Sequence, residues 1–209
     1  MTFVVAIDGP AAAGKGTLAR RLATTLGLAY LDTGLLYRAV GRRVLDAGAA
    51  PADPIAAGAA AGALVATDLT RTDLRGPEAD WASSVVAQQP SVRAALLTFQ
   101  RRFAAQGAVL DGRDIGTVVV PDARVKLFVT ADRAARARRR WLELRGRGVI
   151  IPLAQVEAEL LARDTQDSAR AAAPLAAAVD AVVLDTTGLD ADAAYALALQ
   201  IVQNRVGST

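Results

Sequence analysis

The stretch AIDGPAAAGKGTLARRL, residues 6–22, decides the fold class of this chain. Gly9, Gly14 and Lys15 match a phosphate-binding loop, whose pattern is Gly, four residues, Gly-Lys and then Ser or Thr. An apolar run at 3–8 precedes the loop, and leucines at helical spacing follow it. A loop that joins a buried strand to a helix is the context that the motif requires. This context favours a nucleotide phosphate site over a chance match.

The end of this loop departs from the common pattern. Gly16 occupies the usual hydroxyl position, and Thr17 follows one residue late. We therefore expect Thr17 to serve a Mg²⁺ ion, directly or through water. Lys15 is one of only two lysines, with Lys126, in a chain that otherwise uses arginine. Its compact ammonium is expected to reach the β- and γ-phosphates of a nucleoside triphosphate, beside the positive end of the following helix.

The composition limits the available chemistry. The chain has 209 residues, with no Cys and no His. Disulfides, thiol nucleophiles, Cys/His metal sites and histidine acid–base catalysis are therefore excluded. No uncharged stretch is long enough to span a bilayer, and the N-terminus does not resemble a signal peptide, so we expect a cytoplasmic protein without a membrane partner. A net charge of +3 gives only weak electrostatic attraction for nucleic acid, so we expect no nucleic-acid partner.

Apolar runs and helical patterns alternate along the chain. This alternation predicts an α/β fold with a parallel sheet in three layers and right-handed crossovers. An alanine-rich stretch at 51–69 is left without assigned structure. Strands are expected at 3–8, within 28–32, and at 108–111, 125–129 and 181–184. Helices are expected at 14–26, in the segment that ends near Gly48, and at 91–106, 131–148, 153–164 and 190–205.

The arginines suggest what receives the phosphate. The lone Asn204 disfavours a GTPase, whose guanine site normally uses an Asn-Lys-x-Asp stretch. A hydroxyl acceptor benefits from a carboxylate base, whereas a phosphate acceptor needs cations to offset charge repulsion. If RDTQDSAR is helical, Arg163, Asp167 and Arg170 lie on one face at i, i+4 and i+7. A surface salt-bridge ladder is the ordinary alternative, but beside a phosphate loop a binding site is favoured.

Two acidic and two aromatic positions have more than one interpretation. Asp32 and Asp111 follow apolar runs at expected sheet edges, where ligands bind in open α/β sheets. Each can hold Mg²⁺ waters or cap a turn or helix. Trp81 and Trp141 are predicted to be packing residues rather than platforms on which bases stack.

Five stretches together resemble the bacterial cytidylate kinases: IDGPAAAGKGT, LDTGLLYR, RGPEADWASSVVAQQPSVRAAL, DGRDIGTVVVPDA and RDTQDSARAAAPL. The resemblance covers nearly the whole chain. It implies a P-loop kinase fold with a five-stranded sheet, and transfer of the γ-phosphate of ATP to CMP or dCMP without a general base. It also explains GKGT, since monophosphate kinases commonly carry Gly after the loop Lys and then Thr. ATP and Mg²⁺ are the implied cofactors.

The resemblance also implies residue roles. The cofactor-binding residues are Gly9, Pro10, Ala11, Ala12, Ala13, Gly14, Lys15, Gly16 and Thr17, with Thr17 at the metal. Arg38 and Arg113 resemble clamps on the CMP phosphate, and Thr33 stands beside the substrate where Ser is usual. Ser84, Arg93 and Asp114 resemble the cytosine-reading residues. The implied catalytic set is Lys15, Arg113, Arg163, Asp167 and Arg170, of which Asp167 also contacts the substrate ribose. The loop after Asp185 is implied to lie near the adenine.

The implied organisation is one P-loop kinase domain over 1–209. Its core is expected at 1–47, 91–145 and 170–209, with a monophosphate-binding insert at about 48–90 and a lid at about 146–169. The insert is short and alanine-rich for the family, and Gln166 stands where the family often has another arginine. The roles of the arginines between 136 and 147 are left unassigned.

Two other functions remain open from the sequence. A kinase for a hydroxyl acceptor such as shikimate would use Asp32 as its base. An ATP-gated nucleic-acid-binding protein is supported only by the sequence pI of about 9.8. A monomer is expected, because monophosphate kinases of this size can act alone.

Overall fold

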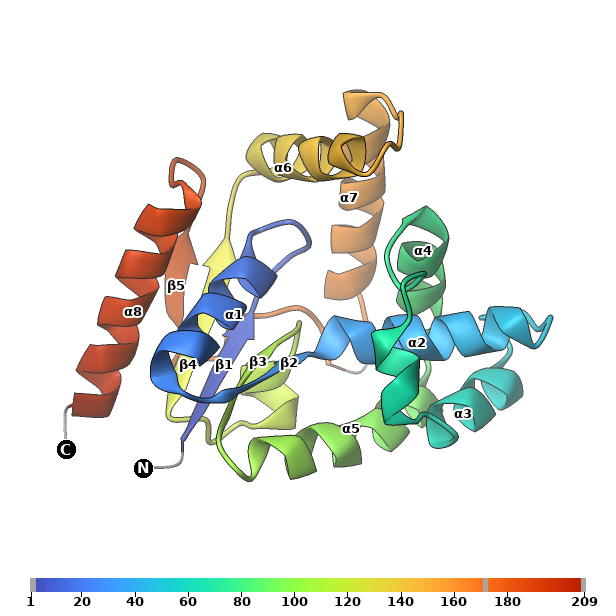
Figure 1. The fold of residues 1–209 in the computed structure, drawn as a ribbon, viewed down its shortest axis with the longest axis horizontal. Helices are drawn as coiled ribbons and strands as arrows, with labels where there is room; N and C mark the ends of the chain where they lie inside the picture. The colour runs from blue at the N-terminus through green and yellow to red at the C-terminus, as the bar shows by residue number, and fades with distance from the viewer. Residues whose placement is uncertain (1–2, 171–172, 208–209) are drawn as a thin grey trace. The chain divides into compact units, whose positions relative to one another are not determined.

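The chain forms two compact units, which are described separately (Figure 1). The computed structural model describes residues 3–170 and 173–207. The first unit comprises Met1–Leu31 and Ala104–Thr209, and the second comprises Asp32–Phe103. The second unit contains the predicted insert, whose boundaries at about 48–90 stay a prediction.

A five-stranded sheet organises the first unit, in the order β2-β3-β1-β4-β5. The central strand β1 pairs in parallel with β3 and β4, and β4 pairs in parallel with β5. The three central strands, β1, β3 and β4, are mostly buried apolar runs, which is why their sequences predicted strands. The predicted α/β class and parallel sheet are confirmed. The strands are β1 (Val4–Asp8), β2 (Ala29–Asp32), β3 (Ala108–Asp111), β4 (Val125–Thr130) and β5 (Val182–Asp185).

Two helices pack together on this sheet, α1 (Lys15–Leu26) and α8 (Ala191–Gly207) (Figure 1). Leu22 from α1, Leu127 from β4 and Val202 from α8 belong to one buried core. Each fully buried aliphatic side chain contributes roughly 1.5–3 kcal/mol relative to its exposed form. This core fixes the end of β1, and therefore the loop that follows it.

Helices α6 (Arg133–Gly146) and α7 (Leu153–Ser168) form a second packed group. Helix α7 ends at Ser168, two residues before the end of the RDTQDSAR stretch. The N–H of Ala169 donates to the Thr165 carbonyl, and the Asp167 carbonyl accepts from Leu175. Arg170 therefore lies beyond the helix, and the prediction that it shares a helical face with Asp167 is wrong.

The second unit is helical. Its elements are α2 (Thr33–Asp46), α3 (Pro54–Gly62), the 3₁₀ turn η1 (Ala66–Thr70), α4 (Pro77–Val86) and α5 (Pro90–Ala104). Asp53 caps α3 by accepting the N–H groups of Ile55 and Ala56, so the alanine-rich stretch contains a capped helix. Gly41 lets α2 approach α4, because a Cβ there would lie 2.9 Å from the Cβ of Ala82.

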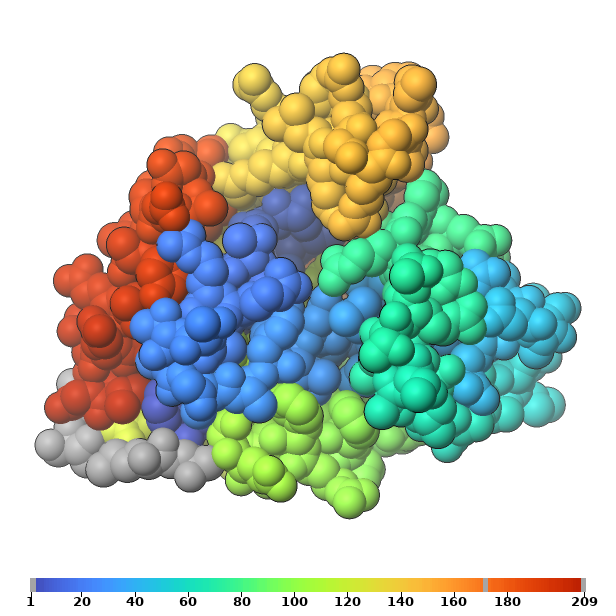
Figure 2. Space-filling view, in the orientation of Figure 1, coloured from blue at the N-terminus to red at the C-terminus, as the bar shows by residue number. Residues whose placement is uncertain are grey.

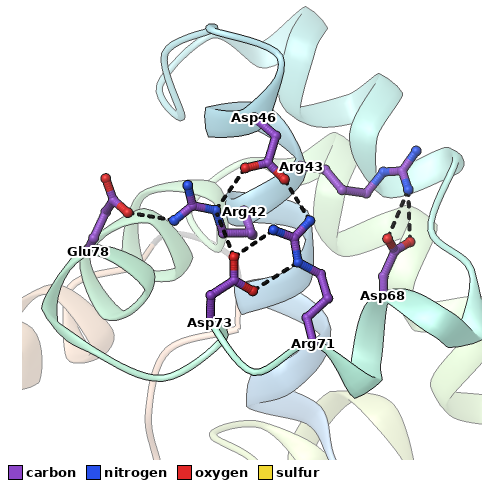
Figure 3. Close-up of polar contacts among 7 residues, drawn as sticks. All are labelled: Arg42, Arg43, Asp46, Asp68, Arg71, Asp73 and Glu78. Atoms are coloured by element: carbon purple, nitrogen blue, oxygen red, sulfur yellow. Dashed lines mark hydrogen bonds and ion pairs between the residues drawn. The ribbon is translucent and has the colours of Figure 1, made fainter.

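A network of ion pairs joins three parts of the second unit (Figure 3). Arg42 on α2 contacts Asp46, Asp73 and Glu78 at 2.9, 3.5 and 2.5 Å. Arg71 contacts Asp46 and Asp73, both at 2.6 Å. Arg71 and Arg42 hold the pKa of Asp46 below its ordinary value, and Arg71 does the same for Asp73. The network ties the segment after η1 to α2 and α4.

We expect Arg71→Met to lower Tm by only a few degrees, because exposed ion pairs are weak and screened by salt. A carboxylate whose folded pKa is lowered stabilises the fold above its unfolded pKa and loses this effect as pH falls through the folded pKa. The Tm difference from wild type should therefore shrink below about pH 4 and in about 1 M NaCl. Thermal melts across pH and salt measure it, with exposed Arg102→Met as the control. A difference that survives both conditions would contradict the electrostatic origin.

Candidate active site

The loop after β1 lies at the topological switch point of the sheet. Strand β1 is flanked by β3 and β4, and the chain crosses from one side to the other around it. Ligands of open α/β sheets bind at such a point. Gly9 has φ +143°, and a Cβ there would lie 1.9 Å from the Val129 carbonyl oxygen, so the loop requires glycine. Gly14 precedes α1 in a left-handed conformation, with no side-chain cap on the helix N-terminus.

Lys15, the first residue of α1, is buried in this loop. Its Nζ donates to the Pro10 carbonyl oxygen at 2.7 Å. Burial and the nearby Arg113 lower the pKa of Lys15 well below its ordinary value, although Asp111 and Asp8 act in the opposite direction. The ammonium is therefore in a site that favours additional negative charge, as a phosphate-binding lysine requires.

A buried carboxylate holds two of the predicted arginines. Asp167 is only 1% exposed. Its Oδ2 accepts from Nε of Arg113 at 2.9 Å, and its Oδ1 accepts from Arg170. The structure thus brings together three of the predicted catalytic residues, from the segment after β3, the end of α7 and the segment beyond it. Two guanidinium groups on one carboxylate leave a net positive cluster in the first unit.

Arg136 anchors α7 to the phosphate loop. Its guanidinium donates to both oxygens of Asp164 on α7, at 3.1 and 2.7 Å, and to the Ala11 carbonyl at 3.2 Å. Ala11 also packs with apolar residues of α6 and α7. Arg163 lies next to Asp164, so this contact fixes the part of α7 that carries a predicted catalytic arginine. The sequence left Arg136 unassigned among the arginines of α6.

A cavity of about 440 Å³ opens beside the loop, within the first unit. In Figure 2 the surface is hollowed between dark blue, yellow and red residues. Arg139 holds one wall by donating to Thr186 Oγ1 at 2.9 Å and to the Leu189 carbonyl at 3.2 Å. The Thr186 hydroxyl also lies 3.2 Å from the Ala13 carbonyl oxygen. The lining includes Ala12, Ala13, Gly14, Thr17, Leu18, Val129, Arg139, Arg140, Glu143, Thr186, Leu189, Asp190, Ala191 and Ala194.

The oxygen donors near the loop suit a Mg²⁺ ion bound with phosphates, which prefers hydroxyl, carboxylate and water oxygens. Thr17 lines the cavity and is exposed. Asp111 accepts from the Tyr30 hydroxyl at 3.1 Å. A Cβ added to Gly16 would lie 3.5 Å from Asp111 Oδ2, so this carboxylate lies directly beside the loop.

Of the remaining predicted substrate residues, Asp114 is buried in the first unit, and the others belong to the second unit. Thr33 begins α2 and is buried. Arg38 donates through Nε and Nη2 to one oxygen of Asp80, at 3.0 and 2.9 Å. Arg93 donates to the Ala87 carbonyl at 3.3 Å and lies over the Tyr37 ring. Ser84 lies on α4. The sequence did not reveal Asp80 or Tyr37, because both contacts join different helices.

Three of the ambiguous sequence positions can now be assigned. Asp32 caps α2 by accepting the Leu35 N–H at 3.3 Å, and it also contacts Arg75. The packing interpretation is confirmed for Trp141, whose ring borders the core of α6 and α7. It is wrong for Trp81, which is 55% exposed, because that position lies on the outer side of α4.

The sequence analysis also missed a buried carboxylate beside the loop. Asp8 ends β1, is buried, and accepts the N–H groups of Ile115 and Gly116, both at 2.7 Å. Burial raises the pKa of its carboxyl to about 6, against the opposing effect of these hydrogen bonds. The apolar run before it had suggested only a strand end.

In the described ranges 3–170 and 173–207, no helix is long and apolar enough to cross a membrane.

Comparison with solved structures bears out the fold. An uncharacterized protein from Eubacterium ventriosum matches with a TM-score of 0.58 at 12% identity, covering 100% of both chains. An unliganded sugar kinase from Janibacter sp. HTCC2649 matches with a TM-score of 0.50 at 15% identity, covering 97% of this chain and 95% of the other. Identities this low concern the fold alone.

Comparison of sequences is more specific. The family model for cytidylate kinase matches residues 5–204. The cytidylate kinase of Granulibacter bethesdensis is 63% identical over 206 residues, covering 98% of this chain and 99% of the relative. That of Acidiphilium cryptum is 61% identical over 201 residues, covering 96% and 95%. With the phosphate loop and the arginine cluster in place, these matches show that the chain belongs to the cytidylate kinase family.

Proposed function

We propose that this enzyme transfers the γ-phosphate of ATP to CMP and dCMP, giving CDP and dCDP with ADP. The observation that carries the proposal is the Arg113–Asp167–Arg170 cluster in the same unit as the phosphate loop. A phosphate acceptor is already an anion and needs cations rather than a base. Full-length similarity to cytidylate kinases supports the same acceptor.

The donor nucleotide is assigned to the first unit. The loop residues 9–14 and Lys15 would hold the triphosphate, and the neighbouring cavity would take the adenosine. Its wall at Thr186 and Leu189 belongs to the loop after β5, which the resemblance to the family had placed near the adenine. ATP follows from the kinase family, and Thr17 and Asp111 supply the oxygen chemistry that Mg²⁺ prefers. Bound with ATP, Mg²⁺ would neutralise phosphate charge.

The transfer itself would need positioning and charge neutralisation. An oxygen of the CMP phosphate forms a bond to the γ-phosphorus as the bond from that phosphorus to the bridging oxygen of ADP breaks. The transition state is loose, with charge spread over the transferring oxygens. Lys15, Arg113, Arg163 and Arg170 are assigned to that charge. No proton must be removed from the acceptor oxygen.

Recognition of the base and its phosphate is assigned to Asp114, Ser84, Arg93, Arg38 and Thr33. A carboxylate accepts from the N4 amino group of cytosine, whereas uracil presents an acceptor at that position. Asp114 would therefore favour CMP over UMP, with Ser84 and Arg93 serving the acceptor edge. Arg38 and Arg113 are assigned to the CMP phosphate, and Asp167 to the ribose.

The other two functions are less favoured. A hydroxyl-acceptor kinase would use Asp32 as a base, but this carboxylate caps α2 and contacts Arg75. A nucleic-acid-binding role has only the basic pI in its support. We propose a monomer that acts in the cytoplasm on small nucleotides, without nucleic-acid or membrane partners.

The test is ADP release from ATP and Mg²⁺, with CMP, dCMP, UMP, AMP, GMP and shikimate supplied one at a time. We expect strong release with CMP and dCMP and weak release with UMP. Product identity is checked by chromatography, and exposed Arg102→Ala serves as the matched control. Release only with shikimate would favour the hydroxyl acceptor. No release with any acceptor, together with salt-sensitive binding to nucleic acid, would favour the third function.

A further inference from the structure

Strand β1 ends in a carboxylate that organises a distant segment of the first unit. The oxygens Oδ1 and Oδ2 of Asp8 accept the N–H groups of Ile115 and Gly116, each at 2.7 Å. These two residues open the π-helical turn η2 (Ile115–Val119), and Asp114 precedes it. The first N–H groups of a helical turn have no acceptor within the turn. Asp8 satisfies two of them from a position 107 and 108 residues earlier in the sequence.

We propose that Asp8 is a positioning residue for CMP recognition, which fixes Arg113 and Asp114 by holding the backbone that directly follows them. The inference rests on the proposed function, because Arg113 and Asp114 are the residues assigned to the CMP phosphate and to cytosine. The Gly112 N–H donates to the Ile7 carbonyl at 2.9 Å, so Arg113 and Asp114 are held to the end of β1 from both sides.

The fit at Gly116 shows how closely this contact is packed. A Cβ at Gly116 would lie 3.4 Å from Asp8 Oδ2 and only 3.1 Å from Cδ of Lys126. A larger residue would therefore push the N–H away from the carboxylate or displace the lysine. Glycine permits the short hydrogen bond. The need for glycine beside Asp8 and Lys126 explains Gly116 of DGRDIGT, which neither charge nor hydrophobic periodicity predicts.

The electrostatics indicate that Asp8 is kept at a cost to stability. Burial raises its pKa to about 6, and the nearby Asp114 adds to the rise, while Lys15 opposes it. A carboxyl with a raised folded pKa loses stability as pH rises from its ordinary value of 3.8 to about 6, because its charged form is disfavoured by burial. The carboxylate supplies two acceptor oxygens for two backbone N–H groups, whereas Asn would supply only one. A role in positioning charged and polar neighbours explains the carboxylate.

Asp8→Asn tests the inference, because it preserves size but replaces one acceptor oxygen with a donor NH₂. We expect KM for CMP to rise about tenfold to a hundredfold, as for other remote misplacements. We expect the ratio of kcat/KM for CMP over UMP to fall about tenfold, since the base reader is no longer fixed. KM for ATP should change less than threefold, and Tm at pH 7.5 should fall by only a few degrees, because removal of the buried charge offsets the backbone N–H left without an acceptor. Exposed Asp122→Asn, which removes a carboxylate charge from the loop after η2, is the matched control.

Gly116→Ala is the second variant, because it leaves Asp8 intact and disturbs the same hydrogen bond. It should reproduce the rise in KM for CMP, and calorimetric titration of CMP should show the same loss of affinity without turnover. Equal rises in both KM values, or an unchanged CMP-to-UMP ratio in a folded Asp8→Asn, would overturn the inference. A wild-type enzyme that does not phosphorylate CMP would instead end the proposed function.

Discussion

Lys15→Met should lower kcat by about 10³-fold and, in the ligand-free protein, raise thermal stability. The first effect follows if the ammonium neutralises the transferring phosphate. The second follows from the burial of that ammonium, whose folded pKa lies well below its ordinary value. Between the folded pKa and the unfolded value near 10.4, the unfolded chain binds more protons than the folded one. Wild-type stability therefore increases as pH rises through this window, and the neutral variant lacks that increase.

Steady-state kinetics and thermal melts at several pH values measure both effects. Exposed Arg102→Met, which also replaces a cation by a thioether, should leave kcat and Tm close to wild type. A Lys15→Met enzyme with wild-type kcat would remove the lysine from the chemistry. A lower Tm would mean that the contact with Pro10 outweighs the cost of burying the charge.

The phosphate loop was predictable because its signals are local. A strand, two glycines, a lysine and a helix lie within about twenty residues, and each follows from periodicity or backbone freedom. The strand at 108–111 was predicted with its observed bounds for the same reason, since it is buried on both faces. The loop therefore identified a nucleotide site before any tertiary contact was known.

The alanine-rich segment shows a local signal that was overlooked. Asp53 and Pro54 are a capping residue and a first-turn proline, and alanine is the strongest helix former. These features predict a helix without any tertiary information. Low sequence complexity argues against assigning structure there, and in this segment that argument fails.

The rest of the site depends on contacts between distant residues. The hydrogen bonds of Asp8 to Ile115 and Gly116, and the pairing of Arg38 with Asp80, involve no local periodicity. Arg170 is the clearest case. Helical spacing suggested that it shared a face with Asp167, but it reaches that carboxylate from beyond the helix end. The predicted helical geometry was wrong, although the two side chains do form an ion pair.

Arg170→Ala should lower kcat by about 10³-fold or more, the range observed for arginines that stabilise a transferring phosphoryl group. The fold should survive, because Asp167 keeps its 2.9 Å contact with Arg113. Tm can fall, since a buried carboxylate loses one of two cationic partners. Arg170→Lys should recover only part of the rate, because a lysine lacks the planar fork that binds two oxygens at once.

A double-variant experiment distinguishes a catalytic Arg170 from a structural one, because it compares the rate lost on Arg170→Ala with and without the Asp167 charge. If its only role is to neutralise Asp167, then Asp167→Asn should remove the need for it, and Arg170→Ala in that background should cost little further rate. If Arg170 acts on the phosphates, the double variant should lose much more rate than Asp167→Asn alone. Kinetics of both single variants and the double variant, with Tm beside them, decide the matter. The two guanidinium groups on one buried carboxylate favour the second outcome, because one pairing already suffices to neutralise that charge.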